Sequence, residues 1–469
     1  MVVLYTGNGS GTKLFQGFLD GHPELFMVPA YPLMYLYPHW HQWEDELRDN
    51  WNWPAIIEAF CVQHASLIDT RRIPGFDGLA RLGETQEDYI SIDEDLFRAY
   101  LGHLLRDEPV AARTFLLAVH YAYAFARGED LSVKKALVYH IHVHEYVRDY
   151  MFDDFPDMLI LATIRDPRSN FTGRYNSSEM DVDAHRYNAT DAAIFKRRVY
   201  YFVTEYLYET LQILDGFPLD RVRGIRHEAL YHDPEGVLRQ TAAFLGIEFL
   251  PCLKYITFGE KSWWGDPIYK MPPMNTVNPK IVSLDWQEKI DGLDWFVFEG
   301  LLFDYMKKYG YPPYKIKRLG FFERIALLLS IFLPSGPERA VFFGYLRPSQ
   351  IRHFLKSLFD EATGRTPFKD YSFNAYYRHK WTQKDLGIWK PRGYVERLNQ
   401  ALQDHGAGPD GAPSMKLRTA QGVYIAVNLL RYGWAVLSYP YWVVRRWGVS
   451  LRSYRRVILG ENILPEALE

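Results

Sequence analysis

The first 25 residues carry the pattern that most restricts the fold. Residues 2–4 are apolar, as expected of a short buried strand, and residues 14–19 have the spacing of leucines and phenylalanines that is typical of a helix. Between them, three glycines at positions 7, 9 and 11 alternate with Asn8 and Ser10. A strand, a glycine-rich turn and a helix N-terminus make an anion site, because backbone N–H groups can approach a phosphate there. The pattern therefore predicts an α/β domain that binds a phosphate-like group.

Side chains of this turn add to its capacity for an anion. Ser10 and Thr12 supply hydroxyl donors, and Lys13 supplies a full positive charge. The turn is not a Walker A loop, since no Gly-Lys-Ser/Thr sequence follows the glycines. We expect six consecutive residues to bind the anion: Gly9, Ser10, Gly11, Thr12, Lys13 and Leu14.

Strand and helix patterns alternate along the following two hundred or so residues. Apolar segments at 136–142, 158–164 and 222–226 predict strands, and helical patterns occupy the ranges 54–68, 92–106, 108–126 and 234–245. Residues 29–55 are rich in Tyr, Trp, His and Pro and predict an irregular segment over a site. The alternation favours an α/β fold with a central parallel sheet, in which ligands bind at the carboxyl ends of the strands.

Two arginines follow the apolar segment at 158–164. Arg165 and Arg168 flank Asp166 and Pro167, so a strand end is followed by a helix start. Arginine at this place suits a phosphate, because its guanidinium group can form paired hydrogen bonds to the oxygens. A surface ion pair with Asp166 is the plainer alternative.

Three alternating histidines end the segment at 136–142. His140, His142 and His144 would point to one face of a strand. Three imidazoles can hold zinc, but no matching carboxylate or cysteine group is apparent, and we expect no metal. Packing of histidines at an aromatic-rich strand end is a further alternative. An imidazole that titrates near neutrality would also serve as a general base.

The order and spacing of these motifs resemble the sulfotransferases that use 3'-phosphoadenosine 5'-phosphosulfate (PAPS). The similarity rests on Ser10-Gly11-Thr12 with the following LDGHPEL (19–25), on Arg165-Asp166-Pro167, and on RHEALYHDP (226–234), and it covers about residues 1–315. It implies a P-loop-NTPase-like architecture and sulfuryl transfer from PAPS without a metal. By the same resemblance, the glycine loop binds the 5'-phosphosulfate, Arg165 binds the 3'-phosphate and His142 is the catalytic base.

The resemblance also implies nucleotide contacts in two later segments. They are Thr172 or Ser177 around Gly173, and Lys261 with Trp263 or Trp264, for which packing of an aromatic loop is the alternative. The chain departs from the family at three positions. Gly9 replaces the basic residue that usually precedes Ser-Gly-Thr, His140 replaces the strand lysine, and Gly173 stands where a serine is usual. We expect Lys13 and a protonated His140 to restore the missing charge and to act in catalysis.

The last third of the chain differs in charge from the rest. Residues 316–469 contain 23 Lys and Arg and 12 Asp and Glu, which gives a net charge of +11. Of the totals of 54 basic and 57 acidic residues, 31 and 45 remain for residues 1–315, which gives a net charge of −14. We expect a helical or irregular extension at 316–404, a linker at 405–414 and a basic amphipathic helical segment at 415–469. The mostly apolar run at 423–444 is interrupted by Arg431 and Pro440, which favours lying in a membrane interface over spanning it. Packing on the catalytic domain is the alternative.

These observations predict a cytoplasmic sulfotransferase held at the inner face of a membrane. Only Cys61 and Cys252 are present, as is usual in a reducing compartment, and a strand and loop at residues 1–12 leave no room for a signal peptide. We expect a hydroxyl of a saccharide, glycan or lipid as acceptor, and no nucleic acid partner. A catalytically impaired membrane scaffold and a nucleotide-dependent kinase are the alternatives.

Overall fold

The computed structural model describes the greater part of residues 2–330 and little beyond. The described ranges are 2–5, 11–30, 33–73, 77–141, 151–170, 217–266, 285–288, 292–330, 332–333, 415–437 and 464–468, with single positions between 346 and 359 and at 444. The predicted ligands Gly9, Ser10, His142, Thr172 and Gly173 lie outside these residues, as does the linker at 405–414.

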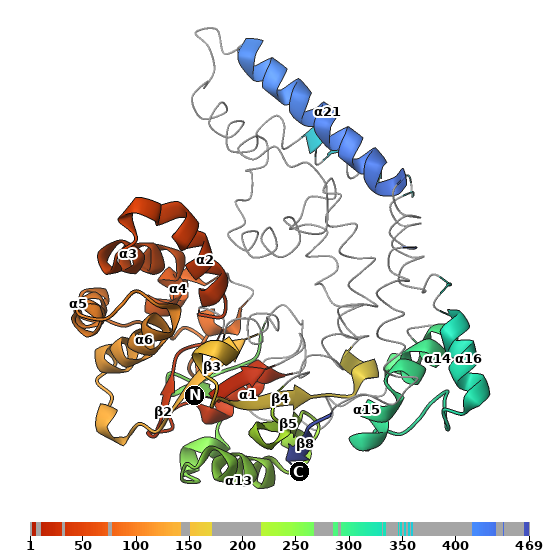
Figure 1. Cartoon of the computed structure of the whole chain (residues 1–469), viewed down its shortest axis with the longest axis horizontal. Coiled ribbons are helices and arrows are strands. Elements are labelled where there is room, and N and C mark those ends of the chain that lie inside the picture. Colours follow the sequence, from red (N-terminus) through yellow and green to blue (C-terminus); the bar gives the residue numbers. More distant parts are fainter. Residues whose placement is uncertain are drawn as a thin grey trace.

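A parallel sheet of six strands forms the centre of the described structure (Figure 1). Its order is β2 (Leu25–Met27), β3 (Ala136–Ile141), β1 (Val2–Tyr5), β4 (Leu159–Ile164), β5 (Val222–Arg226) and β8 (Glu466–Leu468). β3 and β4 are almost continuously apolar because helices cover both of their faces. The predicted α/β fold class with a central parallel sheet is confirmed.

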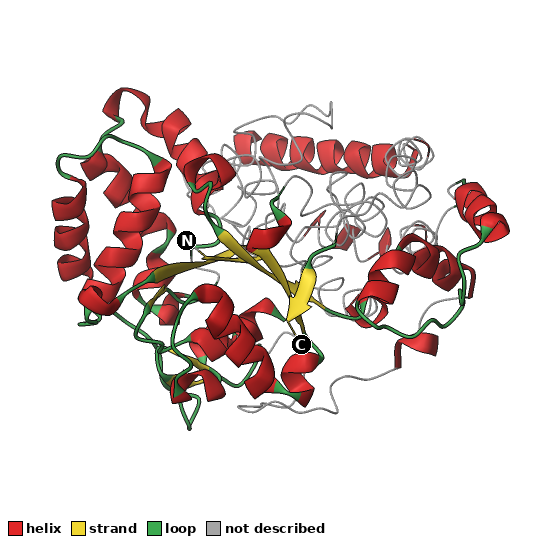
Figure 2. Ribbon diagram, turned by 60° about the horizontal axis from the view of Figure 1, so that its bottom comes forward, coloured by secondary structure: helices red, strands yellow, loops and turns green. Residues whose placement is uncertain are grey.

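Alternate residues of the strands enter two separate cores, one on each face of the sheet (Figure 2). Tyr139 and Ile160 pack on the side of α2 (Leu36–Leu47), α3 (Trp53–Gln63), α5 (Glu94–Leu105) and α6 (Ala112–Ala126). Val138 and Leu161 pack on the side of α1 (Thr12–Leu19) and α13 (Pro234–Leu245). The fold is therefore a three-layer α/β/α arrangement.

The prediction of an irregular segment at 29–55 is wrong, since α2 occupies residues 36–47. Pro38 lies in the first helical turn, where the missing N–H has no intrahelical partner to lose. Trp40 and Trp43, three positions apart, are buried on one face of the helix against Phe115, with ring centroids 5.5 and 6.4 Å away. The aromatic residues thus build a core instead of covering a site.

A third core lies at the end of β4, where Ile164 clusters with buried apolar residues of α14 (Gly292–Leu301), α15 (Phe303–Lys308) and α16 (Phe321–Ser330). β8 returns to this region from the far end of the chain and pairs with β5. The ammonium of Lys308 binds the Glu466 carboxylate and the Leu464 carbonyl, both at 2.8 Å. The Tyr309 hydroxyl donates to the Pro465 carbonyl at 2.9 Å.

One long helix lies apart from the sheet. α21 (Met415–Leu437) occupies the first part of the segment 415–469 (Figure 1). None of the helices in the described ranges has the length and apolar character needed to cross a bilayer.

Candidate functional site

Among the described residues of the predicted site, the first turn of α1, His140 and Arg165 lie where four parallel strands end. The register pairs Tyr5 of β1 with Ile141 of β3 and with Ala162 of β4, and it pairs Ile164 of β4 with Arg226 of β5. All four carboxyl ends therefore lie at one edge of the sheet. α1 begins at the same edge, which is where an α/β sheet binds its ligands.

Gly11 begins α1 in a conformation that requires glycine. Its φ is +91°, and a β-carbon at this position would overlap the imidazole ring of His227. The first backbone hydrogen bond of the helix runs from Phe15 N–H to the Gly11 carbonyl at 3.0 Å. The N–H groups of residues 12–14 thus form the amino-terminal turn, where the helix dipole favours an anion.

Thr12 connects this turn to the sheet. Its side chain is buried, and its hydroxyl lies 3.0 Å from the hydroxyl of Thr163 on β4. Leu14 is partly buried and packs against the core on the α1 side of the sheet. The first turn of α1 is therefore fixed against β4 by one hydrogen bond and by apolar packing.

Lys13 is only 5% exposed and is held by two carboxylates. Its ammonium lies 2.5 Å from Asp77 Oδ1 and 2.5 Å from Asp266 Oδ1. Burial acts to lower the pKa of Lys13, but the charges of Asp266 and Asp77 outweigh it and raise this pKa. Asp266 also accepts the Gly78 N–H at 2.7 Å, so the cluster joins three distant segments. The positive charge of Lys13, which the sequence analysis expected to bind an anion, is thus paired with the carboxylates of Asp77 and Asp266.

His227 connects the start of α1 with the end of β4. It follows β5 directly, its N–H bonds to the Ile164 carbonyl, and its ring touches Gly11. Its Nδ1 atom is buried and has no hydrogen-bond partner among the described residues. Burial lowers the pKa of His227 well below its usual value, and the nearby charge of Arg165 lowers it further. The ring is therefore neutral.

Arg165 is partly buried, and part of its hydrogen bonding is local. Its guanidinium donates to the Ser169 hydroxyl at 3.5 Å, and its carbonyl accepts the Tyr305 hydroxyl at 3.3 Å. The Ile164 carbonyl just before Arg165 accepts the His227 N–H, and the His227 ring touches Gly11, so Gly11 and Arg165 lie at the same edge of the sheet.

Arg168 has a different environment and is 1% exposed. It donates to both carboxylate oxygens of Asp166, at 3.0 and 2.9 Å, and to Glu299 at 2.7 Å. Its guanidinium also lies 4.2 Å from the ring centroid of Trp286. Arg168 therefore connects the end of β4 to α14, and its hydrogen bonds serve the fold.

His140 is the next-to-last residue of β3, lies on the α1 side and is buried. The amide nitrogen of Gln16 donates to the Val28 carbonyl at 2.9 Å, so the Gln16 oxygen is the acceptor for His140 Nδ1 at 2.7 Å. A neutral His140 consequently carries its proton on Nδ1. His142 follows this strand but lies outside the described residues, and within those residues no three metal-ligating side chains gather.

Lys261 and Trp264 contact another part of the chain. The ammonium of Lys261 lies 3.7 Å from the Asp88 carboxylate, and the Trp264 indole donates to the Gly83 carbonyl at 2.6 Å. These described contacts hold the loop against residues 83–88 and involve neither Gly11 nor Arg165.

The sequence reasoning gave His227 no role. A signal was present, because His227 follows the carboxyl end of β5 just as Arg165 follows that of β4. Its contact with Gly11 depends on the register of the two strands and on the bend of the turn, and neither is written in the sequence.

A model of the sulfotransferase family matches residues 8–251, which is more than half of the chain. The chain belongs to this family. This sulfotransferase is consequently a transferase, and the resemblance drawn from its motifs is confirmed. No curated protein matches the sequence.

Two solved sulfotransferase domains are similar to this sulfotransferase in structure. The domain from the curacin biosynthetic pathway is 13% identical in sequence, with a TM-score of 0.33. The match covers 62% of this chain and 92% of that domain. The domain from the olefin synthase of Synechococcus PCC 7002 is 16% identical with a TM-score of 0.32, covering 61% and 87%.

Proposed function

We propose that this sulfotransferase transfers the sulfuryl group of PAPS to a hydroxyl group of a saccharide, glycan or lipid acceptor. One observation carries the proposal: the ring of His227 touches the helix turn at Gly11, and the backbone N–H of His227 bonds to the carbonyl of Ile164, the residue before Arg165. An anion-binding turn and an arginine so close together suit a nucleotide with phosphate groups at both ends. The Nδ1 atom of His227 adds a polar group for that nucleotide.

Different residues bind the nucleotide and transfer the proton in the proposed reaction. The turn at 9–14 holds the 5'-phosphosulfate through backbone N–H groups, and Arg165 holds the 3'-phosphate. An oxygen of the acceptor forms a bond to sulfur while the bond from sulfur to the bridging oxygen breaks. His142 accepts the proton of the acceptor hydroxyl, and the N-terminus of α1 stabilises the negative charge on the departing phosphate.

His140 is suited to an auxiliary role. Its Nδ1 proton is committed to Gln16, which fixes the orientation of the ring at the end of β3. Protonation would then add a positive charge close to the glycine turn and make up for the strand lysine of the family. Lys13 contributes by holding the first turn of α1 in place through Asp77 and Asp266.

The proposed acceptor and place in the cell go together. A basic C-terminal region suits an anionic membrane surface, and an enzyme held there would meet the hydroxyl groups of glycans and lipids. We infer a cytoplasmic enzyme bound peripherally to the inner face of a membrane, with its acceptor on a glycan or lipid there.

A catalytically impaired scaffold is the second candidate function. Gly9 replaces the basic residue of the loop, and the two carboxylates that hold Lys13 neutralise its charge. Such a protein would bind the nucleotide without transferring sulfate.

Calorimetry and sulfate transfer test these proposals separately. The wild type is expected to bind 3'-phosphoadenosine 5'-phosphate (PAP) and to show little affinity for ATP; a preference for ATP would support a kinase and overturn the proposal. Transfer of radiolabelled sulfate from PAPS to membrane extract is expected with the wild type and not with His142→Ala. PAP binding without transfer to any acceptor would favour the scaffold, and unchanged transfer by His142→Ala would remove His142 from its role.

A further inference from the structure

α16 presents its apolar residues to solvent. Phe321, Phe322 and Leu329 are 72%, 79% and 61% exposed, and four further apolar residues of the segment are also exposed: Ile325, Leu328, Phe332 and Leu333. Five of them lie within α16 and, at 3.6 residues per turn, span an arc of about 120° on the helix; Phe332 and Leu333 follow its end. We call these seven residues the α16 face.

The opposite side of the helix is fixed to the protein. Leu327 is fully buried in the core at the end of β4 and packs so closely on Gly300 of α14 that a β-carbon there would lie 2.7 Å from it. Ser330, one turn further on, is also buried. An amphipathic helix of a soluble domain usually turns its apolar stripe inward. Here the packed side of α16 is narrow and the wide apolar side points outward.

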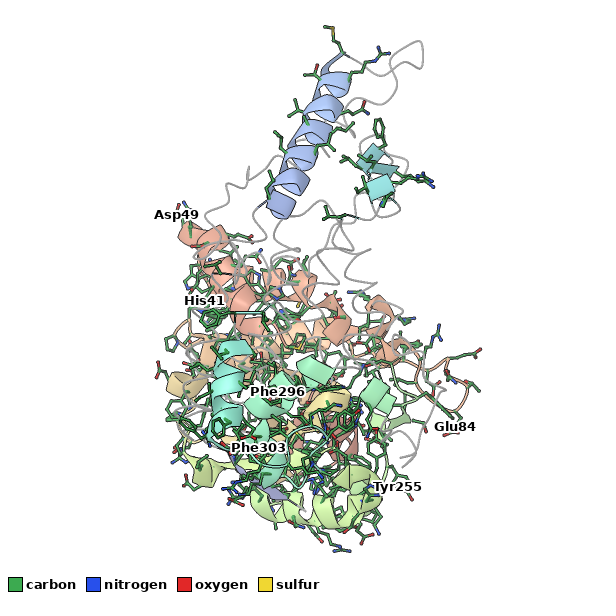
Figure 3. The ribbon with its side chains drawn as sticks, turned by 90° about the vertical axis from the view of Figure 1, so that its right-hand side faces the viewer. His41, Asp49, Glu84, Tyr255, Phe296 and Phe303 are labelled. Atoms are coloured by element: carbon green, nitrogen blue, oxygen red, sulfur yellow. The ribbon has the colours of Figure 1, made fainter. Side chains whose placement is uncertain are left out.

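The position of α16 leaves this face accessible. The helix lies at the outer edge of the described structure in two different views (Figures 1 and 2). Figure 3 looks onto this side, where α16 stands beside Phe296 of α14 and Phe303 of α15. Contiguous exposed apolar residues of this kind mark an interaction surface, because single exposed leucines are common and groups of them are not.

Basic residues stand next to the α16 face. Lys315, Lys317 and Arg318 are exposed just before the helix, and Arg324 lies within it. Glu323 is the single acidic residue between positions 315 and 333, so this stretch has a net charge of +3. Aromatic and leucine side chains beside lysine and arginine are the composition of a helix that lies in an anionic membrane interface.

We propose that the α16 face docks this sulfotransferase on an anionic lipid surface. The apolar side chains enter the headgroup region, and the basic residues before the helix bind the lipid phosphates. A second copy of the chain is less suitable as the partner, because an isologous contact would bring two segments of charge +3 together. This docking rests on the membrane contact proposed above and assigns that contact to α16. It does not depend on which sulfuryl donor the protein uses.

Vesicle co-sedimentation with the full chain tests the proposal. Vesicles of phosphatidylcholine with and without phosphatidylserine are compared for the wild type and for the double variant Phe322→Glu/Leu329→Glu. We expect the wild type to prefer the anionic vesicles and to bind less at high salt. The double variant should lose about tenfold or more of its binding, because two large apolar side chains no longer enter the lipid.

Two control variants locate the contact. Val62 on α3 is 69% exposed but far from the basic residues in sequence, so Val62→Glu should bind as the wild type does. Leu430 and Leu437 of α21 are 75% and 77% exposed, and Leu430→Glu/Leu437→Glu should also retain binding. All variants change exposed residues, and equal thermal midpoints verify their folding.

Several results would overturn the proposal. They are absence of wild-type binding to anionic vesicles, unchanged binding by the α16 variant, and loss of binding by the α21 variant instead. Sedimentation equilibrium without lipid adds a fourth: a dimer that the α16 variant dissociates would assign the face to a second copy. PAP calorimetry on the α16 variant separates the two proposals, since its affinity should equal that of the wild type. Failure of PAP binding in the wild type would refute the proposed donor and leave the lipid result standing.

Discussion

Replacing Lys13 with methionine is expected to destabilise the protein. Lys13 is the cation between two carboxylates, each 2.5 Å from its ammonium and each 8% exposed in its side chain. Methionine keeps much of the apolar stem but leaves Asp77 and Asp266 facing each other in a buried site. Removing one partner from a buried ion pair costs about 3–5 kcal/mol, and we expect a loss in this range.

The loss should depend on pH in a defined direction. Burial raises the pKa of Asp77, the positive charge of Lys13 lowers this pKa, and the negative charge of Asp266 raises it. Removing Lys13 therefore raises the pKa of the Asp77 carboxyl further. A carboxyl whose pKa is raised on folding penalises the folded state above its unfolded pKa of about 3.9. The gap in stability between wild type and Lys13→Met should therefore narrow as the pH falls from 7 toward 4, by up to about 1.4 kcal/mol per unit of pKa shift.

Urea titration of both proteins at several pH values measures this effect. Lys254→Met is the matched control, because Lys254 pairs with Glu235 at 2.8 Å on the surface, with side chains 46% and 43% exposed. Exposed pairs contribute about 0–1 kcal/mol, so the control should change little. A Lys13→Met variant with wild-type stability that has lost PAP binding would refute the structural role and return Lys13 to the anion site.

Three other predictions concern the nucleotide site and the sheet. Arg165→Ala should weaken PAP binding about 10- to 100-fold in calorimetry at unchanged stability, whereas Arg168→Ala should lose about 3–5 kcal/mol in urea titration; the reverse pattern would exchange their roles. Gly11→Ala should abolish PAP binding because its β-carbon overlaps His227, and adding His227→Ala should restore part of it; wild-type affinity in Gly11→Ala would contradict this contact. Leu468→Asp should lower the free energy of unfolding in urea by about 2–5 kcal/mol, because it places a charge in a buried position of β8. An unchanged urea midpoint would show that β8 does not stabilise the fold.

The strands that could be predicted are those whose sequences carry a strong local signal. β3 and β4 are six-residue apolar segments, and their observed bounds differ from the predicted ones by a residue at most. β2 and β8 were missed because three residues are too few to show a period, and β8 depends on pairing with β5 across more than two hundred residues. α2 was missed because prolines and aromatics were given more weight than the spacing of Trp40 and Trp43.

The site could be predicted in its location but not in its side-chain contacts. Glycine spacing and the arginine after β4 placed the anion turn and Arg165 at one edge of the sheet, as observed. The partners of Lys13 could not be predicted, because Asp77 and Asp266 are 64 and 253 residues away and are brought together by packing. For the same reason, nothing in the sequence distinguishes the exposed face of α16 from a buried one.

The pairing of β8 with β5 has a consequence for synthesis of the protein. Residues 227–465 must be added after β5 before its outer neighbour exists, which takes roughly ten to fifty seconds at cellular rates of elongation. During this time the outer edge of β5 exposes unpaired N–H and C=O groups, which can recruit strands from other chains. We expect a nascent chain arrested before residue 464 to bind chaperones more strongly than the finished protein, and recombinant fragments that end near residue 311 to aggregate although they retain the whole family region.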